Sequence, residues 1–236
     1  DALIAGNTVL AAHAFMLKEM KTSAAPVIDP ALEPTVLKMQ MTGGTAWSQL
    51  RGQLDSGLMI DFEEEGKTLK LPLSAIRGKA YSADADVRRR AYEAEIAAYP
   101  RTEIPMAACL NGIKGEALTL IELEKYETIL DTALDASRMD RATLDALLAA
   151  MHESLPMFRR YFRLKAKMLG YEGGLKFYDL FAPMGKANAS FTLDQARDTL
   201  VEVLGKFSKK MGDHIQQAFD ERWIDAFPRP GKRGGA

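Results

Sequence analysis

The sequence predicts a mainly α-helical protein with one small β-hairpin, and two observations support that prediction. Apolar residues recur every three or four positions along most of the chain, which is the period of an amphipathic helix. Within residues 58–73 they alternate with polar residues, which is the period of a β-strand. With 236 residues, of which 47% are hydrophobic, the chain can form one large or two small domains with an ordinary core.

The chain before the hairpin is expected to be helical. Residues 2–24 are rich in Ala, Leu and Met and are followed by Pro26, so a helix is expected to end there. Residues 30–55 are expected to hold two helices, because Thr42-Gly43-Gly44-Thr45 interrupts the helical pattern.

Residues 58–73 predict the hairpin, in which 58–62 pair antiparallel with 68–73. One alternating apolar set precedes a short link and one follows it: Leu58, Ile60 and Phe62, then Leu69, Leu71 and Leu73. Gly66 in the link can take a positive φ, and Pro72 cannot donate to a ladder, so its strand should be an edge. An isolated hairpin is marginal in water, so its apolar face is expected to rest on helices.

Further helices are expected after the hairpin, each with its own start signal. Ser82, followed by Asp84 and Asp86, predicts a hydroxyl-capped start, and Thr192 with Gln195 forms a T-x-x-Q capping box. The expected helices run from about 84 to 99, from 104 to 125, from 140 to the C-cap Gly170, from 192 to 211, and from 213 to 223. Pro156 should kink the third of these or start a new helix, and residues 173–185 should form an extended loop or short strand.

Composition excludes several classes of protein. The formal net charge is −1, so neither a nucleic acid nor an anionic membrane is indicated as a partner. No apolar run approaches the ~20 residues that a membrane helix needs. The single cysteine, Cys109, cannot form a disulfide within the chain, which is typical of a reducing cytosol, so we expect a cytoplasmic protein.

Local motifs predict no catalytic residue and no metal ligand. His152-Glu153 would begin a zinc-binding His-Glu-x-x-His helix, but the fourth following position is Pro156. The other histidines, His13 and His214, are distant in sequence, and the 230–236 stretch lacks the pattern of a phosphate loop. The basic run 159–167 is expected to be the solvated face of an amphipathic helix, with an RNA-facing helix as the alternative.

Several longer stretches nevertheless resemble one family. The stretch LRGQLDSGLMIDFEEEGKTLKLPLSAIRGKAYSADADVRRRAYEAEIAAY is similar to the N-terminal domain of oligoendopeptidase F, a thimet-oligopeptidase-like zinc peptidase. There a hairpin precedes a helix that opens with a D-x-x-V-R-R/K-x-A-type segment, matched here by residues 84–92. YETILDTALDASRMD, FYDLFAPM and AFDERWIDAFPRPGKRGGA resemble the opening of that family's catalytic region, in the same order.

The resemblance implies a two-lobed, clam-like peptidase with a channel for short peptides. It assigns residues 1–125 to a helical N-terminal domain and 126–236 to the opening part of the catalytic domain. In that family the helix with His-Glu-x-x-His follows later, so the resemblance implies a fragment that ends before the metal site. The parent enzyme would use zinc, whereas this chain alone is expected to bind none and to be inactive. Self-association or a large exposed apolar patch is expected around residues 177–183 and 223–227.

The resemblance also provides candidate substrate contacts. Tyr178, Arg229, Lys232 and Arg233 belong to segments that lie near the peptide channel in the family, so they are candidates to bind a peptide carboxylate or backbone. The alternative for each is ordinary loop packing and solvation, because a fold resemblance does not place a site. The alternative function is a non-catalytic helical module that binds peptides or proteins.

Overall fold

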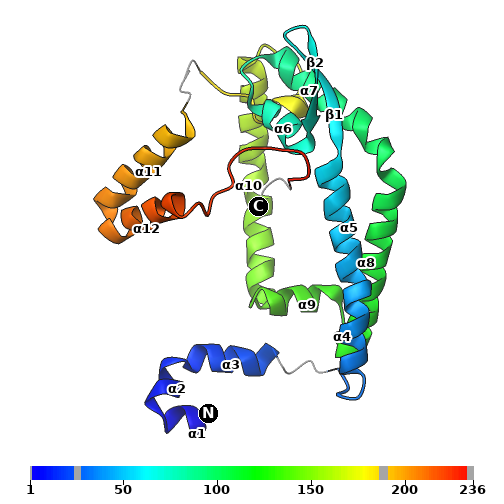
Figure 1. Ribbon diagram of the computed structural model, residues 1–236, viewed down its shortest axis with the longest axis vertical. Helices are drawn as coiled ribbons and strands as arrows, with labels where there is room; N and C mark the ends of the chain where they lie inside the picture. Colours follow the sequence, from blue (N-terminus) through cyan, green and yellow to red (C-terminus); the bar gives the residue numbers. More distant parts are fainter. Residues whose placement is uncertain (1, 24–27, 186–190, 233–236) are drawn as a thin grey trace. The chain divides into compact units, whose positions relative to one another are not determined.

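The computed structural model describes residues 2–23, 28–185 and 191–232 (Figure 1). The chain folds into two compact units, each built from two stretches of sequence: Asp1–Leu54 with Tyr99–Lys176, and Asp55–Ala98 with Phe177–Ala236. The described residues are mainly helical and include a two-stranded antiparallel sheet, which confirms the predicted fold class. Among them, no helix combines the length and apolar character that crossing a bilayer requires.

The first unit consists of helices. They are α1 (Ala2–Ala5), α2 (Thr8–Ala12), α3 (Ala14–Ser23), α4 (Glu33–Thr42), most of α5 (Gly44–Gly57), η2 (Tyr99–Arg101), α8 (Glu103–Glu124), α9 (Ile129–Ala136) and α10 (Arg141–Met168). The expectation of a single helix over 2–24 is wrong. Asn7 interrupts it, because its extended backbone places Oδ1 to accept the N–H groups of Val9 and Leu10 and so starts a new helix.

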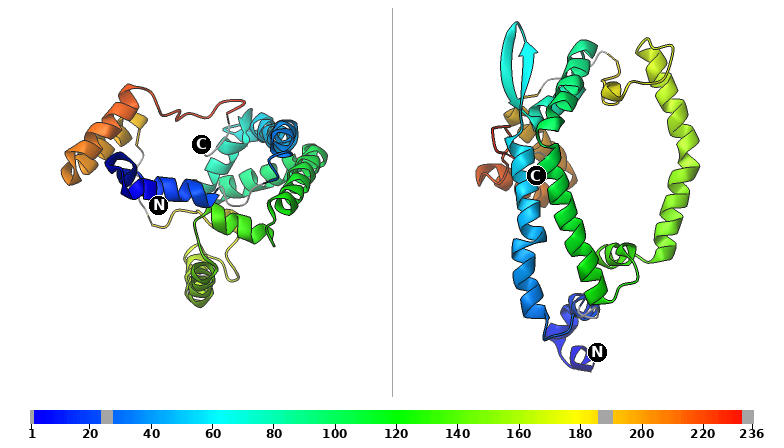
Figure 2. Two further views of the ribbon diagram at one scale, coloured as in Figure 1. Left: turned by 90° about the horizontal axis from the view of Figure 1, so that it is seen from below. Right: turned by 90° about the vertical axis from the view of Figure 1, so that its right-hand side faces the viewer.

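Helices α5 and α8 lie side by side (Figures 1 and 2). The predicted interruption between α4 and α5 falls at Gly43. A carboxylate oxygen of Glu116 accepts the N–H of Gly44 at 2.6 Å, at the start of α5. A Cβ on Gly112 would come within 2.5 Å of the Trp47 ring, so glycine allows this close approach.

Helix α10 begins at the N-cap Asp140, whose side chain accepts the N–H of Thr143 at 2.7 Å. It continues through Pro156, so the alternative of a new helix there is wrong. The C-cap is Leu169, one residue before the predicted Gly170, which follows it with a positive φ of 85°. The basic run on α10 is only partly a solvated face. Lys165 is 5% exposed, because it shares a helix face with half-buried residues at i−3 and i+4.

The second unit contains the hairpin of β1 (Met59–Glu64) and β2 (Lys67–Pro72). The strands pair antiparallel from Met59↔Pro72 to Glu64↔Lys67, which confirms the predicted pairing. Glu65 and Gly66 both have positive φ, 52° and 74°, as a two-residue type I′ turn requires. The alternating residues of β1 point into the core, since Ile60 and Phe62 are 2% and 3% exposed.

Helices cover the hairpin, as expected. The remaining elements of the second unit are α6 (Leu73–Gly78), η1 (Lys79–Tyr81), α7 (Ala85–Ala98), η3 (Phe177–Asp179), α11 (Leu193–Phe207) and α12 (Lys209–Asp220). Both α6 and α7 lie against β1. The start of α7 differs from the prediction: Asp84 accepts the N–H of Asp86 at 2.8 Å, whereas the Ser82 hydroxyl accepts the N–H of Asp84. The aspartate is therefore the cap.

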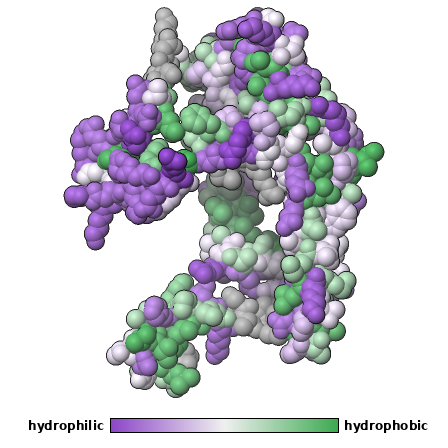
Figure 3. Space-filling model, in the orientation of Figure 1, coloured by the Kyte–Doolittle hydropathy of each residue, from purple (hydrophilic) through white to green (hydrophobic). Residues whose placement is uncertain are grey.

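Helices α11 and α12 form an antiparallel pair (Figure 1). The Thr192–Gln195 capping box is present, as predicted. The boundary between the helices lies at Ser208, whose extended backbone ends α11 four residues before the expected limit. A Cβ on Gly212 would lie 2.9 Å from the Cα of Gly205, so two glycines allow the backbones to meet. Hydrophilic residues cover the face of this pair seen in Figure 3.

Candidate functional site

Tyr178, the first predicted site residue, lies in η3 on the surface of α7. The segment is a 3₁₀ turn, so the expectation of an extended loop or strand is wrong at this point. The ring centroid of Tyr178 is 5.9 Å from that of Tyr92, and the Phe177 ring is 5.6 Å from the same tyrosine. The Tyr178 side chain is half-buried, and its hydroxyl makes no hydrogen bond to any described residue.

A buried ion pair fastens this turn. Nε of Arg88 donates to Oδ1 of Asp179 at 2.8 Å, and the side chains are 3% and 0% exposed. Nη1 of Arg88 also donates to the carbonyls of Ser82 and Ala83, at 2.7 and 3.0 Å. Sequence reasoning missed this pair, because its members are 91 positions apart and neither has a local signal that it would be buried.

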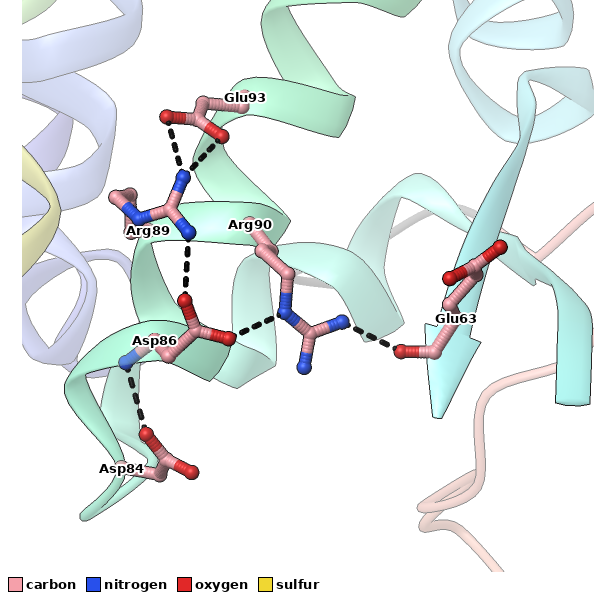
Figure 4. Close-up of polar contacts among 6 residues, drawn as sticks. All are labelled: Glu63, Asp84, Asp86, Arg89, Arg90 and Glu93. Atoms are coloured by element: carbon pink, nitrogen blue, oxygen red, sulfur yellow. Dashed lines mark hydrogen bonds and ion pairs between the residues drawn. The ribbon is translucent and has the colours of Figure 1, made fainter. Parts of the chain in front are cut away.

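The next two arginines of α7 form a surface network (Figure 4). Asp86 accepts from Arg89 at 2.6 Å and from Arg90 at 2.7 Å, and these contacts hold the pKa of its carboxyl below the usual value. Arg89 also donates to Glu93, and Arg90 donates to the carbonyl of Glu63 in β1 at 2.7 Å. Arg90 therefore links α7 to the hairpin, whereas Arg88 links it to η3.

Arg229 and Lys232 gather around one carboxylate, and we call Asp225, Arg229 and Lys232 the Asp225 cluster. Nη1 of Arg229 donates to both carboxylate oxygens, at 2.7 and 2.6 Å. The ammonium of Lys232 contacts the carboxylate at 3.2 Å and donates to the carbonyls of Asp225 and Phe227. Hydrogen bonds from Arg229 and then from Lys232 lower the pKa of Asp225.

The predicted substrate contacts do not form one polar site. No hydrogen bond, ion pair or ring contact joins Tyr178 to Arg229 or Lys232 among the described residues, and Arg233 lies outside them. Asp225, which the prediction omitted, is the residue that brings Arg229 and Lys232 together. The spacing of four between Asp225 and Arg229 is a charge pattern that could have indicated it.

The described residues offer no metal ligand set. A catalytic zinc needs three protein ligands, usually His, Glu, Asp or Cys. Within the described ranges, no group of three or more such side chains lies close enough together to hold an ion. His152 and Glu153 are exposed on α10, and His214 stacks edge-on against Trp223 at 5.5 Å. These residues do not fit a zinc ion, so no step of a metal-dependent reaction is assigned to them.

Large apolar side chains are exposed on both stretches where the sequence predicted them. Tyr81 and Phe181 stack at 5.1 Å, and both are more than half exposed. The exposed apolar residues of the two stretches are Phe177, Phe181, Trp223, Ile224 and Phe227. The exposure agrees with the expectation, whereas self-association stays a prediction.

Comparison with known proteins assigns the family. The model of peptidase family M3 matches residues 79–236, about two thirds of the 236 residues, and the chain belongs to that family. This region includes η3, its partners on α7 and the Asp225 cluster. Enzymes of the family are zinc peptidases, which agrees with the resemblance seen in the sequence.

The relatives include enzymes named for their action on oligopeptides. The chain is 32% identical over 156 residues to the group B oligopeptidase PepB of Streptococcus agalactiae, covering 66% of this chain and 26% of the relative. It is 31% identical to an oligoendopeptidase F homolog of Lactococcus lactis subsp. lactis, with the same coverage. The chain thus spans about a quarter of the length of these curated relatives.

Solved structures show the same fold. The oligoendopeptidase F of Enterococcus faecium superposes with a TM-score of 0.67 at 17% identity, covering 97% of this chain and 49% of that one. PZ peptidase A, solved with an inhibitor, gives a TM-score of 0.75 at 14% identity, covering 95% and 40%. The assignment of residues 1–125 and 126–236 to separate domains stays a prediction. The Arg88–Asp179 pair joins the two ranges.

Proposed function

We propose that the protein to which these residues belong is a zinc-dependent oligopeptidase that hydrolyses short peptides. The observation that supports this function is the match to peptidase family M3 over residues 79–236, together with 32% identity to an oligopeptidase. Within that activity, this chain would provide surface that contacts the peptide. It would not provide the zinc ligands, since the 236 residues contain three histidines and none lies four positions from another.

Tyr178 and Arg229 are the stronger candidates for peptide contact. The hydroxyl of Tyr178 has no partner among the described residues and can donate to a peptide carbonyl. Arg229 is exposed and uses only Nη1 toward described residues, so Nε and Nη2 remain for a peptide carboxylate. Lys232 is a weaker candidate, because three acceptors already surround its ammonium. The predictions for Lys232 and Arg233 stay open.

Residues 1–236 alone are expected to bind no stoichiometric zinc and to cleave no peptide. Water bound to zinc becomes a nucleophile near neutral pH only when the metal is held, and the described residues provide no ligand set. The alternative function, a non-catalytic peptide-binding module, is favoured by the same observation. The two functions differ in whether the whole protein cleaves peptides.

The experiment compares the full-length protein with residues 1–236. Cleavage of quenched fluorescent oligopeptides is measured with and without a chelator and after zinc is restored, and peptide binding is measured for residues 1–236. Chelator-sensitive cleavage by the full protein alone supports the proposal. Binding without cleavage by the full protein supports the alternative, and cleavage by residues 1–236 contradicts the assignment of roles.

Single substitutions test the proposed contacts. Tyr178→Ala and Arg229→Ala should each weaken peptide binding by residues 1–236, because each removes a donor from the proposed surface. Tyr161→Ala is the matched control, since Tyr161 is an exposed tyrosine of α10 whose ring contacts Phe162. Equal effects of Tyr178→Ala and Tyr161→Ala would remove Tyr178 from the site.

A further inference from the structure

The buried Arg88–Asp179 pair lies where one face of α7 meets η3. Arg88 and Tyr92 are four positions apart, so they share a helix face. Arg88 binds Asp179, and Tyr92 packs against Phe177 and Tyr178. An ionic contact and an aromatic contact therefore hold consecutive residues of the same turn.

Arg88 is also tied to the chain that precedes its own helix. Its Nη1 donates to the carbonyls of Ser82 and Ala83, just before the cap of α7. One guanidinium thus joins the 82–83 backbone and the η3 carboxylate, and its planar fork fixes the directions of these bonds. A lysine in its place could not reproduce the geometry.

The ion pair requires an explanation beyond stability. Moving two charges out of water is costly, and an apolar pair of similar volume is often as stable or more stable. What such a pair can add is orientation, because its hydrogen bonds form only when the two segments lie in a narrow range of relative positions. In this unit the pair would orient residues 177–182. That segment ends at Ala182, which is buried, with 3% of its surface exposed.

We infer that Arg88 and Asp179 are a positioning pair, which holds the 177–182 segment against α7 and thereby sets the orientation of Tyr178. The pair acts through Tyr178 and does not itself touch the peptide. This last step rests on the proposed function, in which Tyr178 contacts the substrate. The fastening of the segment does not rest on it.

The first test is hydrogen exchange of residues 1–236, measured by mass spectrometry without peptide. Asp179→Asn should accelerate exchange of the 177–182 amides by at least about tenfold, and by a larger factor than it accelerates exchange in α11 and α12. Asp225→Asn is the matched control, because it removes the same charge from an exposed site of the same unit. Unchanged exchange over 177–182 would overturn the inference whether or not the chain binds peptide.

The second test separates positioning from general stability. The probe is a fluorescein-labelled, Phe-containing peptide with a free carboxyl terminus, and its affinity is measured by anisotropy. Asp179→Asn should weaken binding by about fivefold or more in the wild-type background and add nothing in a Tyr178→Ala background. Additive losses in the double variant would show that the pair does not act through Tyr178.

Further variants cover the case in which Asp179→Asn does not fold. Arg88→Met combined with Asp179→Leu replaces the pair by apolar side chains, which should restore folding but leave peptide affinity low. Arg88→Lys alone should bind the peptide more tightly than the apolar double variant and less tightly than the wild type. Wild-type affinity in the apolar double variant would overturn the inference. An absence of peptide binding by the wild type would count against the proposed function. The hydrogen-exchange result would then still decide whether the pair holds residues 177–182 against α7.

Discussion

Two arginine–aspartate pairs in the second unit have similar geometry and opposite surroundings. The Arg88–Asp179 pair is 2.8 Å long, with side chains 3% and 0% exposed. The Arg229–Asp225 pair is 2.6 Å long, with side chains 60% and 54% exposed. The first joins residues 91 positions apart, and the second joins residues four apart.

The difference in surroundings gives the same chemistry two different roles. Water can replace either partner of the exposed pair, so little stability depends on that contact. Water cannot reach the buried pair, so removing either member leaves the other charge buried without its counter-ion. The buried pair therefore constrains the structure, whereas the exposed pair leaves Nε and Nη2 of Arg229 without a partner among the described residues. Four substitutions or conditions test this comparison.

The largest effect is expected from Asp179→Asn. It leaves the Arg88 charge buried without its carboxylate, so the free energy of unfolding should fall by about 3–5 kcal/mol. Urea denaturation followed by circular dichroism measures the change. Asp225→Asn should leave the urea midpoint within error, and equal losses in the two variants would remove the distinction between the pairs.

A smaller effect is expected from Arg88→Lys. The charge is kept, but a single ammonium cannot reach Asp179 and both carbonyls, so partly buried acceptors lose their donor, which should cost about 1–3 kcal/mol. The same urea denaturation measures the loss, and Arg229→Lys at the exposed pair is the control. A lysine tolerated equally at both sites would show that charge alone matters at position 88.

The exposed pair should lower the pKa measured for the Asp225 carboxyl in a titration. Its pKa lies below the usual value of an aspartate, chiefly because Arg229 binds the ionised form, with Lys232 adding to the effect. The corresponding stabilisation is present above the unfolded-state pKa and is lost as the pH falls through the folded-state pKa. In a carbon-detected NMR titration, Arg229→Ala should raise the Asp225 midpoint toward that usual value. An unchanged midpoint would show that Arg229 does not hold the carboxylate in solution.

The smallest effect is expected from salt. At about 1 M ionic strength the screening length is ~3 Å, so the wild-type pKa of Asp225 should rise slightly. The rise should be smaller than that caused by Arg229→Ala, because the hydrogen bonds from Arg229 and Lys232 persist. The destabilisation by Asp179→Asn should not change with salt. If it did, the buried pair would be exposed to solvent ions.

Sequence patterns predicted the elements whose signals are local. The hairpin followed from a period of two, and the Thr192–Gln195 box marked the start of α11. Boundaries failed where neighbouring polar residues compete for one role, as when Asp84 rather than Ser82 capped α7. The division of residues 2–24 failed for a similar reason, because an internal asparagine capped a new helix.

The polar contacts around the candidate residues were less predictable. Tyr178 was selected through a family resemblance, but nothing in the local sequence indicates that Asp179 would be fully buried. Its partner, Arg88, lies among three consecutive arginines that look equivalent in sequence. The fold alone separates them: Arg88 faces η3, while Arg89 and Arg90 join a surface network. An ion pair between residues far apart in the chain produces no periodic pattern in the sequence from which it could be predicted.

The close approach of Trp47 to Gly112 has a spectroscopic consequence. The chain has two tryptophans: Trp47 lies in the first unit and Trp223 in the second. Trp47 packs against α8, whereas Trp223 is more than half exposed and stacks on His214. Each unit therefore carries its own intrinsic fluorophore. Replacing one indole at a time by phenylalanine would let the emission of the other report on the melting of its own unit, without any added label.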